Sequence, residues 1–315
     1  MKKKEKVVVA LGGNALGRAP EEQIRLVKNT AKPIVDLIEE GHQVILAHGN
    51  GPQVGMINLA MSAANAAAAG TPEMPFPECG AMSQGYIGYH LQNAIREELL
   101  NRGLKVPVAT VITQVIVDKN DPAFEKPIKP IGAFYSEDEA IALMKQHEDY
   151  QMVEDAGRGW RRVVASPIPV DVAEKETVKT LMESGHMVIT VGGGGIPVYE
   201  DGNALKGIPA VIDKDYSAEV IAELMDADYL IILTTVEKVA LNFNTPDEIW
   251  VDQLTVNEAK QYIEEGHFSP GSMLPKVKAA VKFAGSKKGR KSLITSLDKA
   301  KDGIAGQTGT IFIDA

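Results

Sequence analysis

Three apolar runs of this 315-residue chain each end in glycine, and this repeated pattern constrains the fold more than any other feature. They are VVVALGG from Val7, VILAHGNG from Val44 and VITVGGGG from Val188. Continuous apolar runs are typical of strands that are buried on both faces of a parallel sheet. Because ligands bind outside the carboxyl ends of such strands, the three turns predict one shared anion-binding cradle. The alternative is that each is an ordinary strand-to-loop turn.

The periodicity between the first two runs predicts a strand–helix–strand unit. Apolar residues recur at three-and-four spacing from Ile24 to Ile38, and Gly41 ends this helix before the strand Val44–Ala47. Pro52 suits the first turn of a second helix, which continues through an alanine-rich segment. Since this order requires a parallel sheet, we expect an α/β protein built as an open α/β/α sandwich.

The same alternation continues along the chain, with one interruption. Residues 118–169 contain many prolines and acidic residues but few apolar runs, which predicts a small protruding subdomain. We expect two lobes that meet near residue 200. The other expected elements are helices at 84–101, 172–183, 215–225, 256–264 and 273–284, and strands at 106–117, 187–191, 210–212, 229–234, 292–295 and 310–313.

Charge and composition exclude several classes of protein. The formal net charge of −9 (33 basic and 42 acidic residues) disfavours nucleic acid or an anionic membrane as the main partner. No segment has the roughly 18 uninterrupted apolar residues of a membrane span, and the apolar run after MKKKEK is too short for a signal peptide. The single cysteine, Cys79, excludes an intrachain disulfide and a cysteine-based metal site. We expect a cytoplasmic protein.

The two most familiar nucleotide-binding motifs are absent. A GxGxxG motif starting in the cluster at Gly192 would need glycine where Pro197 and Val198 stand, and no GxxxxGK[ST] occurs. A Rossmann dehydrogenase and a P-loop kinase therefore lose their main support.

Positive charge for a bound anion must come from isolated lysines. Lys276 lies at an expected helix start, where a cation opposes the helix dipole unless an anion shares the site. Lys214 lies between Asp213 and Asp215 at an expected strand end. Each lysine also has an interpretation without a bound anion. Lys276 could simply extend its side chain into solvent, and Lys214 could belong to a solvated turn with weak ion pairs.

Three other polar features carry less chemistry. Lys129 lies between Pro127 and Pro130, a pattern that favours an ordinary extended linker over a functional lysine. His48 is interpreted as a packed histidine at a strand end rather than a base. The basic run at 287–291 predicts a solvated turn.

Taken together, the motifs resemble those of the carbamate kinases within the amino acid kinase family. They span nearly the whole chain in the family's order, and the last four are the most specific. The motifs are ALGGNAL at 10–16, HGNGPQVG at 48–55, AMSQGYIGY at 81–89, KPIG at 129–132, EDAGRGWRRVV at 154–164, GGGGIPV at 192–198, AVIDKD at 210–215 and GHFSPGSMLPK at 266–276.

The resemblance implies a mainly parallel eight-stranded sheet, a homodimer, and the reaction ATP + carbamate = ADP + carbamoyl phosphate, run toward ATP in arginine or ureido catabolism. Residues 1–200 would hold the carbamoyl group and residues 201–315 the nucleotide. Mg²⁺ would arrive with ATP or ADP, because the sequence offers no dedicated carboxylate cage. The rivals are a kinase of the same family for another carboxylate or for uridylate, and a nucleotide-binding regulator without turnover.

The resemblance also assigns the site residues, with Asp215 organising two of the functional lysines. The pattern departs from the family at Gly17–Pro20, and at Thr234–Val236, which reads TTV where TGV is expected. The assigned catalytic residues are Lys129, Lys214, Asp215 and Lys276; the substrate-binding residues are Gly12, Gly13, Asn14, Gly49, Asn50, Gly51, Gly193 and Gly194; and the nucleotide-binding residues are Lys214, Thr234, Val236, Met273 and Lys276.

Overall fold

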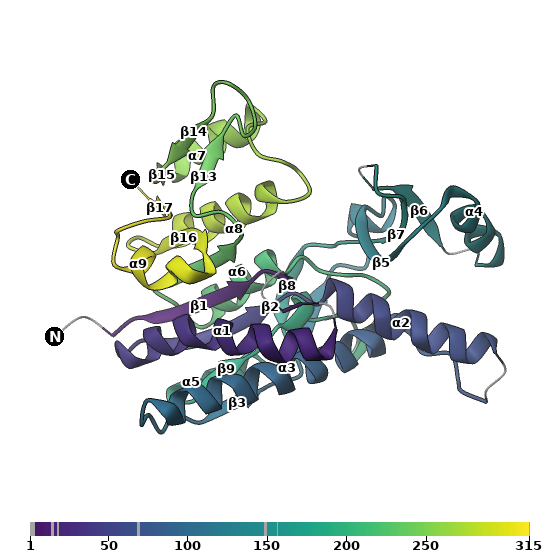
Figure 1. Cartoon of the computed structure of the whole chain (residues 1–315), viewed down its shortest axis with the longest axis horizontal. Coiled ribbons are helices and arrows are strands. Elements are labelled where there is room, and N and C mark those ends of the chain that lie inside the picture. The colour runs from purple at the N-terminus through teal and green to yellow at the C-terminus, as the bar shows by residue number, and fades with distance from the viewer. Residues whose placement is uncertain are drawn as a thin grey trace.

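The structure, a computed structural model, describes residues 4–13, 16–17, 19–67, 70–147, 150–155 and 157–314. Its largest feature is an eight-stranded sheet in the order β15-β17-β16-β12-β1-β2-β9-β3 (Figure 1). Neighbouring strands are parallel except β16 with β17. The strands are β1 (Lys6–Leu11), β2 (Gln43–His48), β3 (Val108–Thr110), β9 (Met187–Ile189), β12 (Tyr229–Thr234), β15 (Gln253–Thr255), β16 (Lys291–Ser296) and β17 (Thr310–Ile313).

Strand β1 lies in the middle of this sheet and is buried on both faces. Its side chains alternate between two hydrophobic cores, so Val8 and Ala10 join one core while Val7 and Val9 join the other. This alternation explains why the first apolar run is continuous rather than alternating with polar residues. All five residues from Val7 to Leu11 are buried, which confirms the prediction of a strand covered on both sides.

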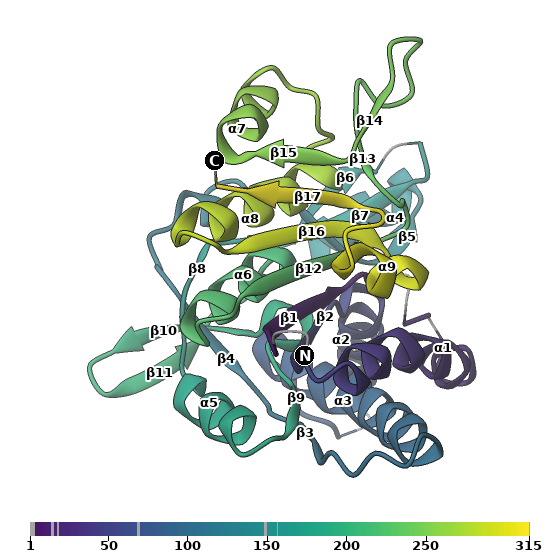
Figure 2. The same cartoon turned by 90° about the vertical axis from the view of Figure 1, so that its left-hand side faces the viewer.

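Helices cover both faces, which confirms the predicted α/β/α sandwich (Figure 2). On one face lie α1 (Pro20–Glu39), α3 (Phe76–Asn101) and α9 (Ala300–Ile304), and on the other lie α5 (Lys175–Glu183), α6 (Lys214–Leu224), α7 (Val256–Glu264) and α8 (Met273–Ser286). Within the described ranges, no helix is both long and apolar enough to cross a membrane.

A small subdomain protrudes from this body beside helix α2 (Gly51–Ala66), as Figure 1 shows. It contains a three-stranded antiparallel sheet in the order β5-β7-β6 and one helix. The elements are β5 (Lys129–Tyr135), α4 (Glu137–Gln146), β6 (Gln151–Glu154) and β7 (Trp160–Val164), preceded by the short 3₁₀ helix η2 (Pro122–Phe124). A protruding subdomain was predicted from the change in composition, and the structure confirms it.

Two predicted strands differ from the structure, one of them because part of it joins a separate four-stranded sheet. The expected strand 106–117 is two strands, of which β3 joins the main sheet while β4 (Gln114–Val117) joins the order β11-β10-β4-β8. The expected strand 210–212 was wrong, because Ala210 makes only an isolated bridge to Ala165. The sequence reading also missed the hairpin of β10 (Ile196–Asp201) and β11 (Ala204–Gly207) and the pair β13 (Val239–Leu241) and β14 (Ile249–Val251).

Two helix starts also differ from the prediction. Helix α3 begins at Phe76 rather than residue 84, because Pro77 occupies the first turn, where its missing N–H costs nothing. Helix α5 begins at Lys175 rather than 172, because Val172 belongs to β8 (Pro169–Val172). The remaining 3₁₀ turns are η3 (Gly192–Gly194) and η4 (Leu297–Lys299).

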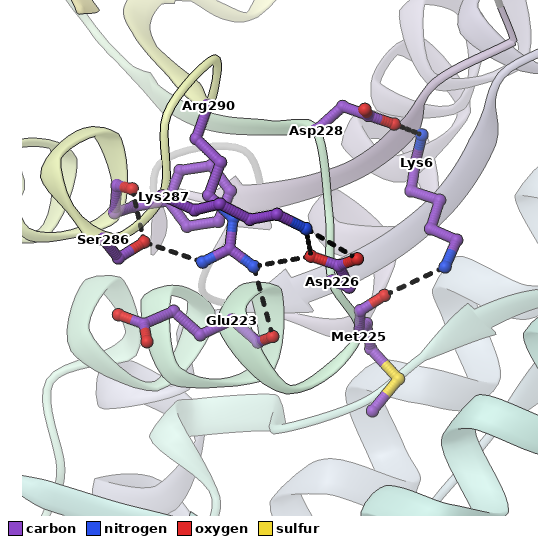
Figure 3. A network of polar contacts seen from close by, with 9 residues as sticks. Lys6, Glu223, Met225, Asp226, Asp228, Ser286, Lys287 and Arg290 are labelled. Atoms are coloured by element: carbon purple, nitrogen blue, oxygen red, sulfur yellow. Dashed lines mark hydrogen bonds and ion pairs between the residues drawn. The ribbon is translucent and has the colours of Figure 1, made fainter. Parts of the chain in front are cut away.

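The basic run at 287–291 is not simply a solvated turn. Arg290 is only 8% exposed, and its guanidinium donates to Ser286 Oγ at 2.7 Å and to Asp226 at 3.0 Å (Figure 3). Lys287 reaches the same carboxylate at 2.7 Å, and these hydrogen bonds hold the pKa of Asp226 below its usual value. The run therefore ties α8 and β16 to the end of α6, which corrects the prediction for Arg290.

The four-glycine run at 192–195 is explained by close packing. A methyl group on Gly195 would lie 2.1 Å from Val115 Cγ2, and one on Gly194 would lie 2.1 Å from the carbonyl oxygen of Ile212. Both glycines also have positive φ, +88° and +90° respectively. A side chain is therefore disfavoured at each position for two reasons, the left-handed backbone conformation and the lack of space.

We predict that Gly195→Ala lowers the free energy of unfolding by about 3 kcal/mol, since it adds left-handed strain to overpacking. Urea denaturation measures this loss. Gly202→Ala is the matched control, because Gly202 also has positive φ (+62°) but has no atom within 4 Å of an added methyl group. The control is expected to lose about 1 kcal/mol. Equal losses in the two variants would contradict the packing explanation.

Candidate active site

A cleft of about 650 Å³ opens at the carboxyl ends of β1, β2 and β12. The glycine turns, the start of three helices and strand β5 surround it. Its lining residues are Gly12, Gly13, Gly49, Asn50, Gly51, Pro52, Lys129, Pro130, Ile131, Gly193, Val211, Ile212, Asp213, Lys214, Asp215, Leu233, Thr234, Thr235, Gly271, Ser272, Lys276, Ser296, Leu297 and Asp298.

The three glycine turns meet in this cleft, as their sequence pattern predicts. An added methyl group on Gly49 would lie 3.7 Å from the backbone nitrogen of Gly13 and 3.4 Å from Lys214 Cδ. A methyl group on Gly193 would lie 2.1 Å from the Asn50 amide. The turn after β2 is therefore close to the other two, and at residue 193 only glycine leaves room for Asn50.

Helix α3 holds two of these turns from behind. Asn50 Nδ2 donates to Ser83 Oγ at 2.8 Å, and Gln84 Nε2 donates to the carbonyl oxygens of Gly192 and Thr113, both at 3.0 Å. Gln84 Oε1 also accepts from the Thr113 backbone N–H at 2.8 Å. All four side chains are buried. The motif AMSQGYIGY contains Ser83 and Gln84, to which no role was assigned from the sequence. The structure shows that they anchor the cradle.

Lysines and aspartates that line the cleft form an ion network beside the glycine turns. Asp215 is 1% exposed and takes Lys276 Nζ at 2.8 Å on one carboxylate oxygen and Lys214 Nζ on the other. Asp213 accepts Lys129 Nζ at 2.5 Å and, with its other oxygen, the Asp215 backbone N–H at 3.0 Å. The solvated-turn alternative for Lys214 and the linker alternative for Lys129 are therefore wrong.

Burial and the neighbouring charges shift the pKa values of the groups in this network. Burial lowers the pKa of Lys214, and the nearby charge of Lys276 adds to this effect against the attraction of Asp215 and Asp213. Burial also opposes the charged form of Lys276, but Asp215 outweighs it and raises that pKa. Burial would raise the pKa of Asp213, yet the charges of Lys129 and Lys214 bring it well below its usual value. Three lysines thus share two carboxylates.

Three helix N-termini add to this positive field. The cleft is lined by Gly51 at the start of α2, Lys214 at the start of α6, and Ser272 just before α8. Each helix start carries partial positive charge on its unpaired backbone N–H groups. Asp215 compensates the lysines at two of these starts only in part, since it is shared between them, so the cleft is suited to phosphate groups.

A second cavity, of about 190 Å³, adjoins the cleft and shares Thr234, Thr235, Ser272 and Lys276 with it. It holds the predicted nucleotide residues Val236 and Met273. Its other lining residues were not predicted from the sequence, because they come from separate segments of the chain. They are Lys238, Ala240, Phe243, Trp250, His267, Phe268 and Ser269.

Most predicted site residues line one of these two cavities, but Gly194 lies behind the cleft. Its N–H donates to the Val191 carbonyl at 3.0 Å. The N–H of Gly49 is likewise engaged, by the Leu11 carbonyl at 3.2 Å. Asn14 falls outside the described residues. Asp213, Ser296 and Asp298 also line the cleft but were not predicted as site residues. Of these, Asp213 could have been indicated by the sequence, because it lies within the motif AVIDKD at 210–215.

His48 is a packed histidine rather than a base, as predicted. Its side chain is fully buried, Nδ1 lies 2.9 Å from the Gly49 carbonyl, and Nε2 faces Gly192. Because a carbonyl only accepts, Nδ1 carries the proton. Burial lowers the pKa of His48 to about 4, although the Gly49 carbonyl opposes this shift.

Comparison with known sequences identifies the family. The sequence model described as the amino acid kinase family matches residues 5–296. The chain belongs to this family. The carbamate kinase-like protein YqeA of Escherichia coli (strain K12) is 61% identical over 307 residues, covering 98% of each chain. The carbamate kinase of Clostridium perfringens (strain 13 / Type A) is 54% identical over 310 residues, covering 97% of this chain and 98% of the relative.

Solved structures of the family agree with the fold. Carbamate kinase from Giardia lamblia bound to AMP-PNP superposes with a TM-score of 0.91 at 41% identity, with complete coverage of both chains. This likeness confirms the predicted amino acid kinase fold with its mainly parallel eight-stranded sheet.

The cleft provides for Mg²⁺ only indirectly. Among the described residues, no group of three or more His, Cys, Asp or Glu side chains is arranged to hold a metal ion. The two buried carboxylates, Asp213 and Asp215, already accept lysines. These donors fit an ion whose ligands are mainly phosphate oxygens and water, so Mg²⁺ carried by a nucleotide remains the prediction.

We predict that His48 makes stability fall in acid. The unfolded histidine takes up a proton below about pH 6.5 and the folded one only below about pH 4, so stability is full above this window and is lost as the pH falls through it. Between pH 7 and pH 5 the loss is about 2 kcal/mol more for the wild type than for His48→Gln. Urea denaturation at both pH values checks this, with His147→Gln, at an exposed position, as control. A parallel pH dependence in wild type and His48→Gln would refute the prediction.

Proposed function

We propose that this chain is a carbamate kinase, which transfers a phosphoryl group reversibly between ATP and carbamate. A relative with that name covers nearly the whole chain at 54% identity, and one solved relative with the same name has the same fold. The observation that carries the proposal is the arrangement of Lys129, Lys214 and Lys276 around two carboxylates in one cleft.

The chemistry requires charge neutralisation more than a base. A carbamate oxygen is already anionic, so it attacks phosphorus without losing a proton, and alignment with charge stabilisation supplies the catalysis. The cleft fits this demand, because no histidine is among the described residues that line it. Its two buried carboxylates are both occupied by lysines. The third carboxylate that lines the cleft, Asp298, is exposed, so an acceptor that needed deprotonation would find no unpaired buried carboxylate among these residues.

Each residue takes a role from its position. Lys214 and Lys276 hold the phosphates of the nucleotide and the transferring phosphoryl group, and Asp215 fixes the separation of these two ammonium groups. Lys129 contacts the same group from the subdomain. In the direction toward ATP, a terminal oxygen of ADP bonds to phosphorus as the bond from phosphorus to the carbamate oxygen breaks.

The two ends of the substrate pair lie in different parts of the chain. The carbamoyl group lies against the turns at Gly12, Gly13, Gly49, Asn50, Gly51 and Gly193, within residues 1–200. The nucleotide base lies in the second cavity beside Thr234, Val236 and Met273, within residues 201–315. Mg²⁺, when bound with the nucleotide, neutralises phosphate charge.

The decisive experiment is coupled ATP formation from ADP and carbamoyl phosphate with Mg²⁺. The E. coli relative has a name ending in "-like", which makes the acceptor worth testing directly. A panel of acetyl phosphate, glutamyl phosphate and uridine nucleotides in the same assay separates carbamate from other acceptors. ADP binding without any phosphoryl transfer would instead indicate a regulator. Flux toward ATP in arginine or ureido catabolism remains part of the proposal.

We predict that Lys276→Ala reduces kcat by about 10²- to 10³-fold, because one cation at the transferring group is removed. The coupled assay measures the loss, and circular dichroism checks that the fold is intact. Lys278→Ala is the control, since Lys278 lies on the same helix but is exposed. A folded Lys276→Ala protein with wild-type turnover would disprove the assignment.

We also predict a homodimer, so light scattering in solution should give a mass of twice 33.9 kDa. A mass of 33.9 kDa across micromolar concentrations would contradict this. A cytoplasmic location remains the expectation from the sequence.

A further inference from the structure

Strand β5 connects the protruding subdomain to the cleft. Its first residue is Lys129, which reaches Asp213 at 2.5 Å, and Pro130 and Ile131 follow along the wall of the cleft. The fourth residue, Gly132, has φ of +71°, and the pairing of β5 with β7 shifts register between Ile131 and Tyr135. The strand therefore bends at a glycine just after it leaves the cleft.

The backbone of helix α2 touches β5 at this bend. A methyl group on Gly55 would lie 2.5 Å from Gly132 Cα and 2.6 Å from Gly132 N. Both are backbone atoms, which cannot rotate away as a side chain can. No side chain separates the two elements here, so Gly55 fixes how closely β5 approaches the helix.

Buried residues on each side of the contact hold it in place. Val54 and Ile131 are 1% and 3% exposed and belong to a small core with Val211, which lies two residues before Asp213. In addition, Arg161 donates to the Gly132 carbonyl at 3.2 Å. The same helix begins at the turn containing Asn50 and Gly51, so α2 positions both the glycine cradle and β5.

We propose that Gly55 is a positioning residue for Lys129: its contact with Gly132 sets the distance of the Lys129 ammonium from the glycine cradle. This inference rests on the proposed function for its catalytic consequence and on the structure alone for the position of Lys129. Methyl and backbone atoms need about 3.5 Å or more, so an alanine displaces β5 by about 1 Å.

The test is Gly55→Ala, with Gly85→Ala as the matched control because Gly85 is an exposed helical glycine with open space for a methyl group. A displacement of about 1 Å should lower kcat about 10- to 100-fold. The KM for ADP should stay unchanged, since no residue of β5 lines the cavity proposed for its base. In a Lys129→Ala background, Gly55→Ala should have no further effect. Wild-type turnover in folded Gly55→Ala, or full additivity with Lys129→Ala, would overturn the proposal.

A second readout does not depend on the reaction. Acylation of lysines by an amine-reactive ester, followed by peptide mass spectrometry, should show Lys129 labelled more slowly than exposed Lys291 in the wild type and several-fold faster in Gly55→Ala. Unchanged labelling would overturn the positioning role. If the wild type forms no ATP from carbamoyl phosphate, the proposed function fails while this arm still tests the contact.

If Gly55→Ala does not fold, Ile131→Val replaces it. This change removes one methyl group from the small core beside the Gly55–Gly132 contact and costs about 1 kcal/mol, which leaves the fold intact. Faster labelling of Lys129 in this variant supports the proposal, and wild-type labelling refutes it.

Discussion

The buried carboxylate of Asp215 is the interaction on which the cleft depends. It holds two lysine ammonium groups, one from α6 and one from α8, at a point where two helix starts already carry positive charge. Without it, like charges in a low-dielectric site would repel and the lysines would turn to solvent. Asp213 does the same for Lys129 and also caps α6, so each aspartate has both a structural and an electrostatic function.

The ion pairs between α6 and α8 continue away from the cleft. Lys282 donates to buried Glu219 at 2.6 Å, and Lys287 and Arg290 reach Asp226 at the far end. Burial is the main cause that raises the pKa of Glu219, to about 8. Helices α6 and α8, which carry Lys214 and Lys276, are therefore held together along their length. The separation of the two lysines does not depend on Asp215 alone.

Much of this fold could be predicted from the sequence because its strongest signals are local. Continuous apolar runs such as Val7–Leu11 give buried strands, and periodic segments such as α1 give helices. The hairpin of β10 and β11 was missed because its exposed residues carry neither pattern. In the site, the family motifs indicated the lysines, whereas the roles of Asp213, Ser83 and Gln84 depend on partners far away in the sequence. Such pairings arise only when the chain folds.

The continuity of the main sheet has a consequence for motion. Strand β1 pairs with β2 on one side and with β12 on the other, so residues from the first and last thirds of the chain form one hydrogen-bonded surface beneath the cleft. Opening the cleft by swinging the two halves apart would break the β1–β12 ladder, which joins five residue pairs. The subdomain that carries Lys129 is not part of this surface, and it contacts the body through α2, the small core with Val211, a bridge between Ala165 and Ala210, and the ion pair with Asp213. The glycine cradle and the start of α6 are therefore supported by one continuous sheet, whereas Lys129 enters the cleft from a subdomain that has a sheet of its own.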